Sequence, residues 1–131
     1  MVLFKALAHG VNLIRHSLRD VGISQKRSSK WPKVEKDFLS KHPECEACGG
    51  KDRLNIHHIV PFHIDQSLEL DESNLITMCM GANECHLRIA HSGNFRYWNP
   101  DVRHICKELQ EKKLTLKQAE QVSLTKLKKS S

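Results

Sequence analysis

Two cysteine pairs constrain the fold of this chain more than any other feature of its sequence. Two residues separate Cys45 from Cys48, and five separate Cys79 from Cys85. Zn²⁺ takes four thiolates in a tetrahedron, and a Cys-x2-Cys turn presents two of them from one short segment. The second loop, MGANE, is longer than the common form but still closes a short chelate. The spacing therefore predicts a structural zinc site made by all four cysteines.

Free cysteines and a redox Cys-x-x-Cys are the alternatives to zinc. The paired spacing disfavours the first, and the lack of a surrounding βαβ pattern disfavours the second. The fifth cysteine, Cys106, falls on an apolar helical face and is expected to be a small buried hydrophobe. A chain of 131 residues with 39% hydrophobic residues suits one domain held by such a staple.

Charge and compartment point to a polyanionic partner inside the cell. The formal net charge is +6, from 21 Lys and Arg against 15 Asp and Glu, although charge alone is weak support. No apolar run reaches the roughly 20 residues that span a bilayer. Lys5, His9, Asn12 and Arg15 interrupt the N-terminus, which does not look like a secretory signal. We expect a reducing cytosol, where paired cysteines favour metal over disulfide.

Hydrophobic periodicity predicts a small α+β fold with flanking helices. Apolar residues from Phe4 to Val21 recur at helical spacing, which fits a packing helix, a dimerisation helix or a basic transit peptide. Residues 24–30 are polar and basic, and they form either a linker along phosphates or a solvated loop. The further expected elements are a helix from Trp31-Pro32 to Pro43, strands over 53–59 and 74–78, a helix from Asn83 or Glu84 to His91, a helix capped by Asp101 and a short helix after residue 113.

His57 and His58 lie next to each other in the first expected strand. Successive side chains of a strand point to opposite faces, so the two histidines can serve different tasks. Hydrolysis of a phosphodiester needs an activated water and a cation that absorbs charge on the phosphate. One histidine can hold the metal while its neighbour acts as general base, a role for which a pKa near neutrality is suited.

The stretches CEACGG, HHIVPFH, NLITMC and ECHLRIAHSGNFRYWNP resemble the HNH endonuclease family, specifically its small zinc-bound members of phages and prophages. The resemblance covers about residues 30–105 and implies a ββα-metal (His-Me finger) core with a four-cysteine zinc knuckle. We therefore expect a nuclease domain at 30–105, preceded by a helix and basic linker at 1–29. A basic helical tail would occupy 106–131.

The resemblance also implies a role for each matched residue. His57, where many members carry Asp, would bind the catalytic metal, and His86 and His91 would complete its protein ligands. His58 would be the general base. Asn74 would brace the loop between the strands and keep His58 in aim. By the same resemblance, Mg²⁺, Mn²⁺ or Ni²⁺ would be the catalytic ion, distinct from the structural zinc.

The spacing of the last two histidines strains this pattern. His86 and His91 are five residues apart, which puts them roughly 140° apart around an ideal α-helix. Either the helix ends before His91 or only one of the two binds metal, and His86 ranks slightly higher. The long loop before Cys85 could also shift His86 relative to the base. His63, just beyond the first strand, is a surface histidine or a phosphate contact.

The predicted function is a DNA endonuclease, with two alternatives of other classes. These are a zinc-stapled nucleic-acid-binding module without turnover and a purely structural zinc protein of a larger assembly. DNA would be held mostly through phosphates, with weak sequence preference. The expected DNA contacts are Arg27, Lys30, Arg53, Arg88 and Arg96. We further expect a monomer or dimer in the bacterial cytoplasm, of phage or prophage origin, without membrane contact and with phage packaging proteins as further partners.

Overall fold

The computed structural model describes residues 26–129 as a small α+β fold, so the predicted N-terminal helix lies outside the described residues. The elements in chain order are α2 (Trp31–Lys41), β1 (Leu54–His58), the 3-10 turns η1 (Gln66–Leu68) and η2 (Glu72–Asn74), β2 (Leu75–Cys79), the π-helix η3 (His86–Ala90), β3 (Tyr97–Trp98), α3 (Val102–Gln110), α4 (Leu116–Leu124) and β4 (Lys128–Lys129).

An antiparallel pair, β1 and β2, forms the centre of the fold. The register places His57 opposite Ile76 and His58 opposite Leu75, and every residue of β2 is buried. A long connection with the turns η1 and η2 joins the two strands. Asp65 and Asp71 cap these turns by accepting hydrogen bonds from the backbone two residues on. The connection is therefore ordered by its own short polar side chains.

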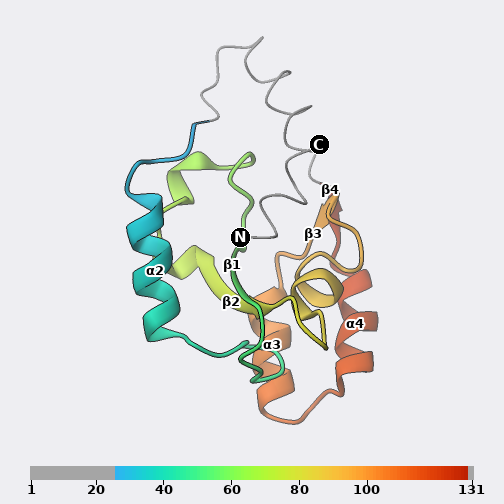
Figure 1. Ribbon diagram of the computed structural model, residues 1–131. Helices are drawn as coiled ribbons and strands as arrows, with labels where there is room; N and C mark the ends of the chain where they lie inside the picture. The colour runs from blue at the N-terminus through green and yellow to red at the C-terminus, as the bar shows by residue number, and fades with distance from the viewer. Residues whose placement is uncertain (1–25, 130–131) are drawn as a thin grey trace.

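Helix α2 covers one side of this strand pair (Figure 1). It begins at Trp31 with a proline in its first turn, where the missing N–H costs nothing. The buried Trp31 and Phe38 pack with Ile56 of β1 and Leu75 of β2 in a small hydrophobic cluster. This cluster fixes α2 directly against the strand that carries His57 and His58.

The C-terminal helices pack on the other side of the fold and form the larger core (Figure 1). Helix α4 contacts both α3 and η3. Thr115 and Gln118 form a reciprocal capping box at the start of α4. Val102, Ile105 and Cys106 of α3 are almost completely buried, which agrees with the expectation that Cys106 serves as a small hydrophobe.

Most expected elements are present, with four corrections. The strands predicted at 53–59 and 74–78 are Leu54–His58 and Leu75–Cys79. The expected helix to His91 is wrong in type and length, because the chain forms a π-helix over His86–Ala90 only. Asp101 begins α3 without a side-chain cap, since Asn99 Oδ1 accepts a hydrogen bond from the Asp101 N–H instead. The short pair of β3 with β4 was not predicted.

Candidate functional site

The four predicted zinc ligands lie together. The Sγ atoms of Cys45, Cys48, Cys79 and Cys85 all lie within 4.8 Å of one another, and none of these cysteines is in a disulfide. Cys48 Sγ lies 3.7 Å from Cys79 Sγ. A tetrahedron with Zn–S bonds of about 2.3 Å separates its sulfurs by about 3.8 Å. The four-cysteine cluster therefore fits a tetrahedral zinc ion in donor type and spacing.

The backbone of the first cysteine turn supports this arrangement. Gly50 donates its N–H to Cys48 Sγ at 3.4 Å, and the Cys45 N–H donates to the Gly50 carbonyl at 2.8 Å. Gly49 adopts a φ of 75°, a left-handed conformation that glycine reaches without steric cost. The two glycines thus make the tight turn that brings backbone N–H groups towards the sulfurs.

Ionisation within the four-cysteine cluster shows why it needs a cation. A hydrogen bond from Cys85 lowers the pKa of Cys45 to about 5. The same hydrogen bond, together with burial, raises the pKa of the Cys85 thiol, and burial raises that of Cys79. One thiolate therefore forms readily, while its charge opposes ionisation of its neighbours. A divalent ion would reverse this opposition and hold all four thiolates.

The long loop between Cys79 and Cys85 is accommodated by a close backbone approach. A Cβ at Gly81 would force the Asp52 carboxylate to move and would lie 3.1 Å from the Asp52 carbonyl oxygen, so the loop passes close to the backbone of Asp52. The Met80 N–H donates to the Arg53 carbonyl at 2.8 Å, which ties the loop to the start of β1. Cys85 is fully buried, and η3 begins at the next residue. The loop therefore carries the chain from the cysteine cluster directly into the second candidate site.

Three predicted metal ligands, His57, His86 and His91, form a second cluster. One ring nitrogen from each lies within 4.8 Å of the others, and all three residues are buried. His57 Nδ1 lies 3.0 Å from His86 Nε2. Metal–nitrogen bonds of about 2.0–2.1 Å place neighbouring nitrogen ligands about 3.0–3.4 Å apart. The three-histidine cluster therefore has the dimensions of a coordination site.

The π-helix removes the spacing problem between His86 and His91. The His91 N–H donates to the His86 carbonyl at 3.2 Å, five residues back. A π-helix aligns residues five apart, whereas an α-helix aligns those three or four apart. The two imidazoles are stacked, with centroids 5.1 Å apart and an interplanar angle of 20°. The expectation that only one of His86 and His91 binds metal rested on α-helical geometry. The π-helix η3 instead brings both rings next to that of His57.

The hydrogen bonds of these rings leave nitrogens without partners. His91 Nδ1 donates to the Tyr97 carbonyl at 2.9 Å, which leaves Nε2 with its lone pair. His91 Nε2, His57 Nε2 and His86 Nδ1 are buried and have no hydrogen-bond partner among residues 26–129. Burial lowers the pKa of all three histidines, that of His91 to about 4. They are neutral at physiological pH, which is the form that binds metal.

Asn99 stabilises the end of η3, and the sequence analysis missed it. Its side chain is fully buried, and Nδ2 donates to the Ile89 carbonyl at 3.1 Å. Its backbone N–H donates to the Ala90 carbonyl at 3.0 Å. Carbonyls at a helix end lack partners within the helix, and Asn99 satisfies two of them. The only available signal was an asparagine before Pro100, which reads equally well as a turn.

His58 lies beside the histidine cluster but has different partners. Its Nε2 lies 2.9 Å from the carbonyl oxygen of Glu69, and its ring centroid is 4.5 Å from that of Trp31. A carbonyl only accepts, so Nε2 carries the proton and Nδ1 keeps the lone pair. Burial lowers the pKa of His58 to about 4, so the imidazole is neutral and able to accept a proton. Neither Trp31 nor Glu69 was singled out from the sequence.

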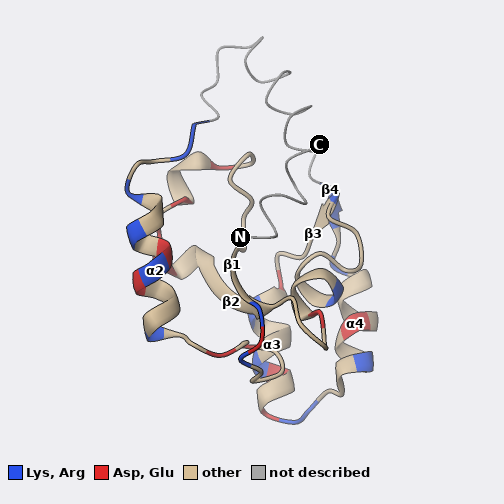
Figure 2. Cartoon of the chain, viewed as in Figure 1, with Lys and Arg blue, Asp and Glu red and all other residues tan. Residues whose placement is uncertain are grey.

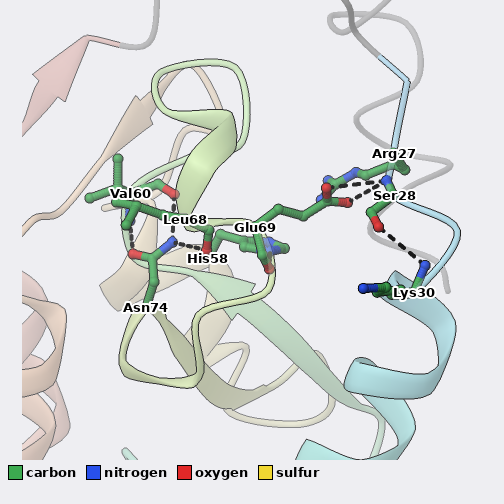
Figure 3. A network of polar contacts seen from close by, with 8 residues as sticks. All are labelled: Arg27, Ser28, Lys30, His58, Val60, Leu68, Glu69 and Asn74. Atoms are coloured by element: carbon green, nitrogen blue, oxygen red, sulfur yellow. Dashed lines mark hydrogen bonds and ion pairs between the residues drawn. The ribbon is translucent and has the colours of Figure 1, made fainter.

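Asn74 bridges both sides of the connection between β1 and β2 (Figure 3). Its Oδ1 accepts from the Val60 N–H at 2.8 Å, and its Nδ2 donates to the carbonyls of Val60 and Leu68 at 3.1 and 3.3 Å. The Asn74 backbone carbonyl also accepts from the Ile59 N–H. Asn74 thus fixes the segment after His58 against the turn that precedes Glu69.

The residues expected to contact DNA are dispersed. Figure 2 shows Lys and Arg spread over several elements of the described fold. Arg88 pairs with Glu120 at 2.9 Å, and Arg27 lies 3.7 Å from Glu69, while Lys30, Arg53 and Arg96 are exposed. The partly buried His63 takes part in an interaction of its own. The five residues lie on four separate segments of the chain, and their contact with DNA remains a prediction.

No helix within residues 26–129 has the length and apolar character needed to cross a membrane.

The family model described as HNH endonuclease matches residues 45–92. This segment begins at Cys45, ends just after His91, and contains every residue of the two clusters as well as His58 and Asn74. Searches of curated proteins and of solved structures found no match to the chain. The resemblance to the HNH endonuclease family is therefore confirmed over residues 45–92, which include β1, β2 and η3 of a ββα-metal fold.

Proposed function

We propose that this protein is a metal-dependent DNA endonuclease in which His58 is the general base. One observation carries the proposal. Three buried, neutral imidazoles each bring one ring nitrogen within 4.8 Å of the others, next to a histidine whose own ring is oriented by a backbone carbonyl. A nucleophile-activating base with a fixed orienting partner, beside a candidate metal site, is the arrangement that hydrolysis of a phosphodiester requires.

His57, His86 and His91 would hold the catalytic ion. A bound divalent ion would stabilise negative charge on the phosphate and on the leaving oxygen. Three neutral imidazoles without a carboxylate favour borderline transition ions over Mg²⁺, which prefers oxygen ligands. Of the three expected ions, Ni²⁺ therefore suits this site better than Mg²⁺ or Mn²⁺, both of which prefer oxygen ligands. The four thiolates of the cysteine cluster would hold a separate structural zinc.

The chain's own residues then have separable tasks. The Glu69 carbonyl holds the His58 Nε2 proton, so that Nδ1 accepts a proton from the attacking water. Trp31 covers one face of the His58 ring and limits its rotation. Asn74 donates to the carbonyls of both Val60, just after His58, and Leu68, and so holds these two parts of the connection together. The net charge of +6 favours a polyanionic substrate, and DNA is the substrate that we propose.

A plasmid-nicking assay with added divalent ions tests this function. Wild-type protein should convert supercoiled plasmid to open circles in Ni²⁺ or Mn²⁺, and His58→Ala should be slower by about 10²–10⁴-fold. His104→Ala is the matched control, because His104 is an exposed histidine on α3 that pairs with Glu108 on the same helix. A wild-type protein that binds DNA but cuts under none of these ions would establish the non-catalytic binding module instead.

The setting of this activity forms a further part of the proposal. We place the protein in a bacterial cytoplasm, with a phage or prophage origin, because a reducing compartment suits cysteines that pair in sequence without forming disulfides. Cutting of DNA during phage packaging, next to packaging proteins, is the biological role that we propose for such a nuclease. Chromatography of packaging-protein mixtures with and without this chain tests that association directly.

A further inference from the structure

Glu69 is a buried acidic residue in the polar connection between β1 and β2. It is 5% exposed, and both carboxylate oxygens accept from the Ser28 N–H at 3.2 Å. Arg27 Nη1 lies 3.7 Å from Oε1, so the carboxylate also has a cationic neighbour (Figure 3). Burying a carboxylate is costly unless hydrogen bonds and opposite charge compensate it. These contacts to residues 27 and 28 supply that compensation.

The basic segment before α2 is thereby attached to the strand connection. The Arg27 guanidinium also lies over the Phe62 ring, 4.4 Å from its centroid, and 5.5 Å from that of Trp31. Cation–π contacts of this kind hold a guanidinium in a defined plane. Arg27 is therefore engaged by the fold on several sides, while its expected contact with DNA stays a prediction.

The backbone of Glu69 has a second role at the candidate active site. Its carbonyl oxygen is the acceptor for His58 Nε2 at 2.9 Å. A displacement of the Glu69 side chain therefore displaces the group that orients the base. On the opposite side, Asn74 Nδ2 holds the Leu68 carbonyl at 3.3 Å, one residue earlier. The carbonyl that aims His58 is thus fixed from two directions, by Asn74 and by the side chain of Glu69.

We propose that Glu69 is a positioning residue for the general base, acting through its own backbone carbonyl and held by the segment Arg27–Ser28. The inference rests on the proposed function, since it gives His58 the role of base. It assigns to the segment before α2 a part in catalysis instead of a contact with DNA alone. Loss of the Glu69 side chain would let the backbone after η1 shift and the His58 ring rotate. The four-cysteine cluster at the end of β2 would stay intact.

The test compares Glu69→Ala and Glu69→Gln with Glu72→Ala. Glu72 is the matched control, because it lies in the same connection but is exposed and pairs with Lys41 at 3.1 Å. Each purified protein is assayed for steady-state nicking of supercoiled plasmid at saturating and limiting DNA. NMR gives a second readout, the rate at which the His58 Nε2 proton exchanges with water, which does not depend on any cleavage activity.

Glu69→Ala should lower the rate at saturating DNA about tenfold or more, as loss of an orienting partner commonly does. The DNA concentration for half-maximal rate should stay within about twofold, because no substrate contact is lost. Exchange of the His58 Nε2 proton should accelerate about tenfold. Glu69→Gln keeps an oxygen that accepts the Ser28 N–H but loses the charge facing Arg27, so its rate should fall about threefold. Glu72→Ala should match wild type in both readouts.

Several results would overturn the proposal. One is wild-type cleavage or wild-type proton exchange in Glu69→Ala; if that protein does not fold, the same result in Glu69→Gln decides. A rise in the half-saturating DNA concentration with an unchanged maximal rate would make Glu69 part of the DNA-binding surface instead. If wild-type protein cuts no DNA, the proposed function fails, and proton exchange alone still decides whether Glu69 positions His58.

Discussion

The four-cysteine cluster and the three-histidine cluster differ in how complete they are. The cysteine cluster supplies four soft ligands at tetrahedral spacing, which leaves no position for another group. The histidine cluster supplies three nitrogens, so an ion held there would keep positions for water and substrate. Closed sites stabilise a fold, while open sites perform chemistry. We propose that the cysteine cluster serves folding and the histidine cluster serves catalysis, and the following experiments test this division.

The largest effect is expected when one ligand of the four-cysteine cluster is removed. Cys79→Ser should abolish cooperative unfolding and bound zinc together, because binding of a structural zinc is worth on the order of 10 kcal/mol of folding free energy. Circular dichroism on heating and metal analysis of the purified protein measure the two losses. Cys106→Ala is the matched control, since Cys106 is equally buried but lies outside the cluster. A folded, zinc-free Cys79→Ser protein would contradict the structural assignment.

Opening the histidine cluster should affect activity much more than folding. His86→Ala and His91→Ala should each reduce nicking about 100-fold or more, because both rings share one site through η3. Each variant should keep its zinc and its melting temperature within a few degrees. Titration with Ni²⁺, followed by calorimetry, measures the lost second site. If His91→Ala nicks plasmid as fast as wild type while His86→Ala is inactive, His86 is the sole metal ligand from η3.

The histidine cluster should also make stability depend on pH. Burial lowers the pKa of His57, His86 and His91 in the folded state, that of His91 to about 4, against about 6.5 when unfolded. The unfolded chain therefore binds protons first as pH falls, so stability is present above pH 6.5 and is lost towards pH 4. One such histidine contributes about 2 kcal/mol of this loss between pH 6.5 and 5.

Urea unfolding of protein that carries zinc but no second metal measures this loss. A smaller pH slope is expected in His91→Ala, which removes one of the titrating groups. Saturating Ni²⁺ should raise the stability of wild type without flattening the slope, because the unfolded chain still takes up protons that the metal-bound histidines do not. Equal slopes in wild type and His91→Ala would show that His91 does not contribute to the pH dependence of stability.

The smallest effect is expected at Asn99, which supports the histidine cluster from outside. Asn99→Ala removes the donor to the Ile89 carbonyl and should lower nicking about tenfold by loosening the end of η3. Ni²⁺ affinity should fall in parallel, while zinc content stays constant. Asn94→Ala offers a control, as Asn94 is an exposed asparagine in the following turn. Unchanged Ni²⁺ affinity in Asn99→Ala would separate Asn99 from the site.

The cysteine pairs and the strand carrying His57 and His58 were predictable because their signals are local. Two ligands in one turn, or two faces of one strand, follow from spacing without knowledge of the fold. The π-helix was not predictable, because five residues of η3 read equally well as a turn of α-helix. Its stability depends on Asn99 and α4, which approach from later in the chain.

Glu69 shows a different limit. A glutamate among the polar residues of a long connection has the composition of a solvated loop, and nothing nearby marks it as buried. Its partners at residues 27 and 28 are about forty positions away in the sequence, at a separation of 41 for Ser28. The same holds for Trp31, whose contact with His58 crosses from α2 to β1. Such pairs become visible only when the fold brings them together.

Cys85, the last ligand of the cysteine cluster, is joined by a single peptide bond to His86, the first helical ligand of the other. Two ions held on neighbouring residues would each affect the binding of the other, since each would fix backbone that the other needs. By linkage this influence would be mutual, so that filling the histidine site would tighten zinc binding by the same factor by which zinc tightens binding at the histidine site. Loss of either metal would then weaken retention of the other, which couples the histidine site to the integrity of the fold.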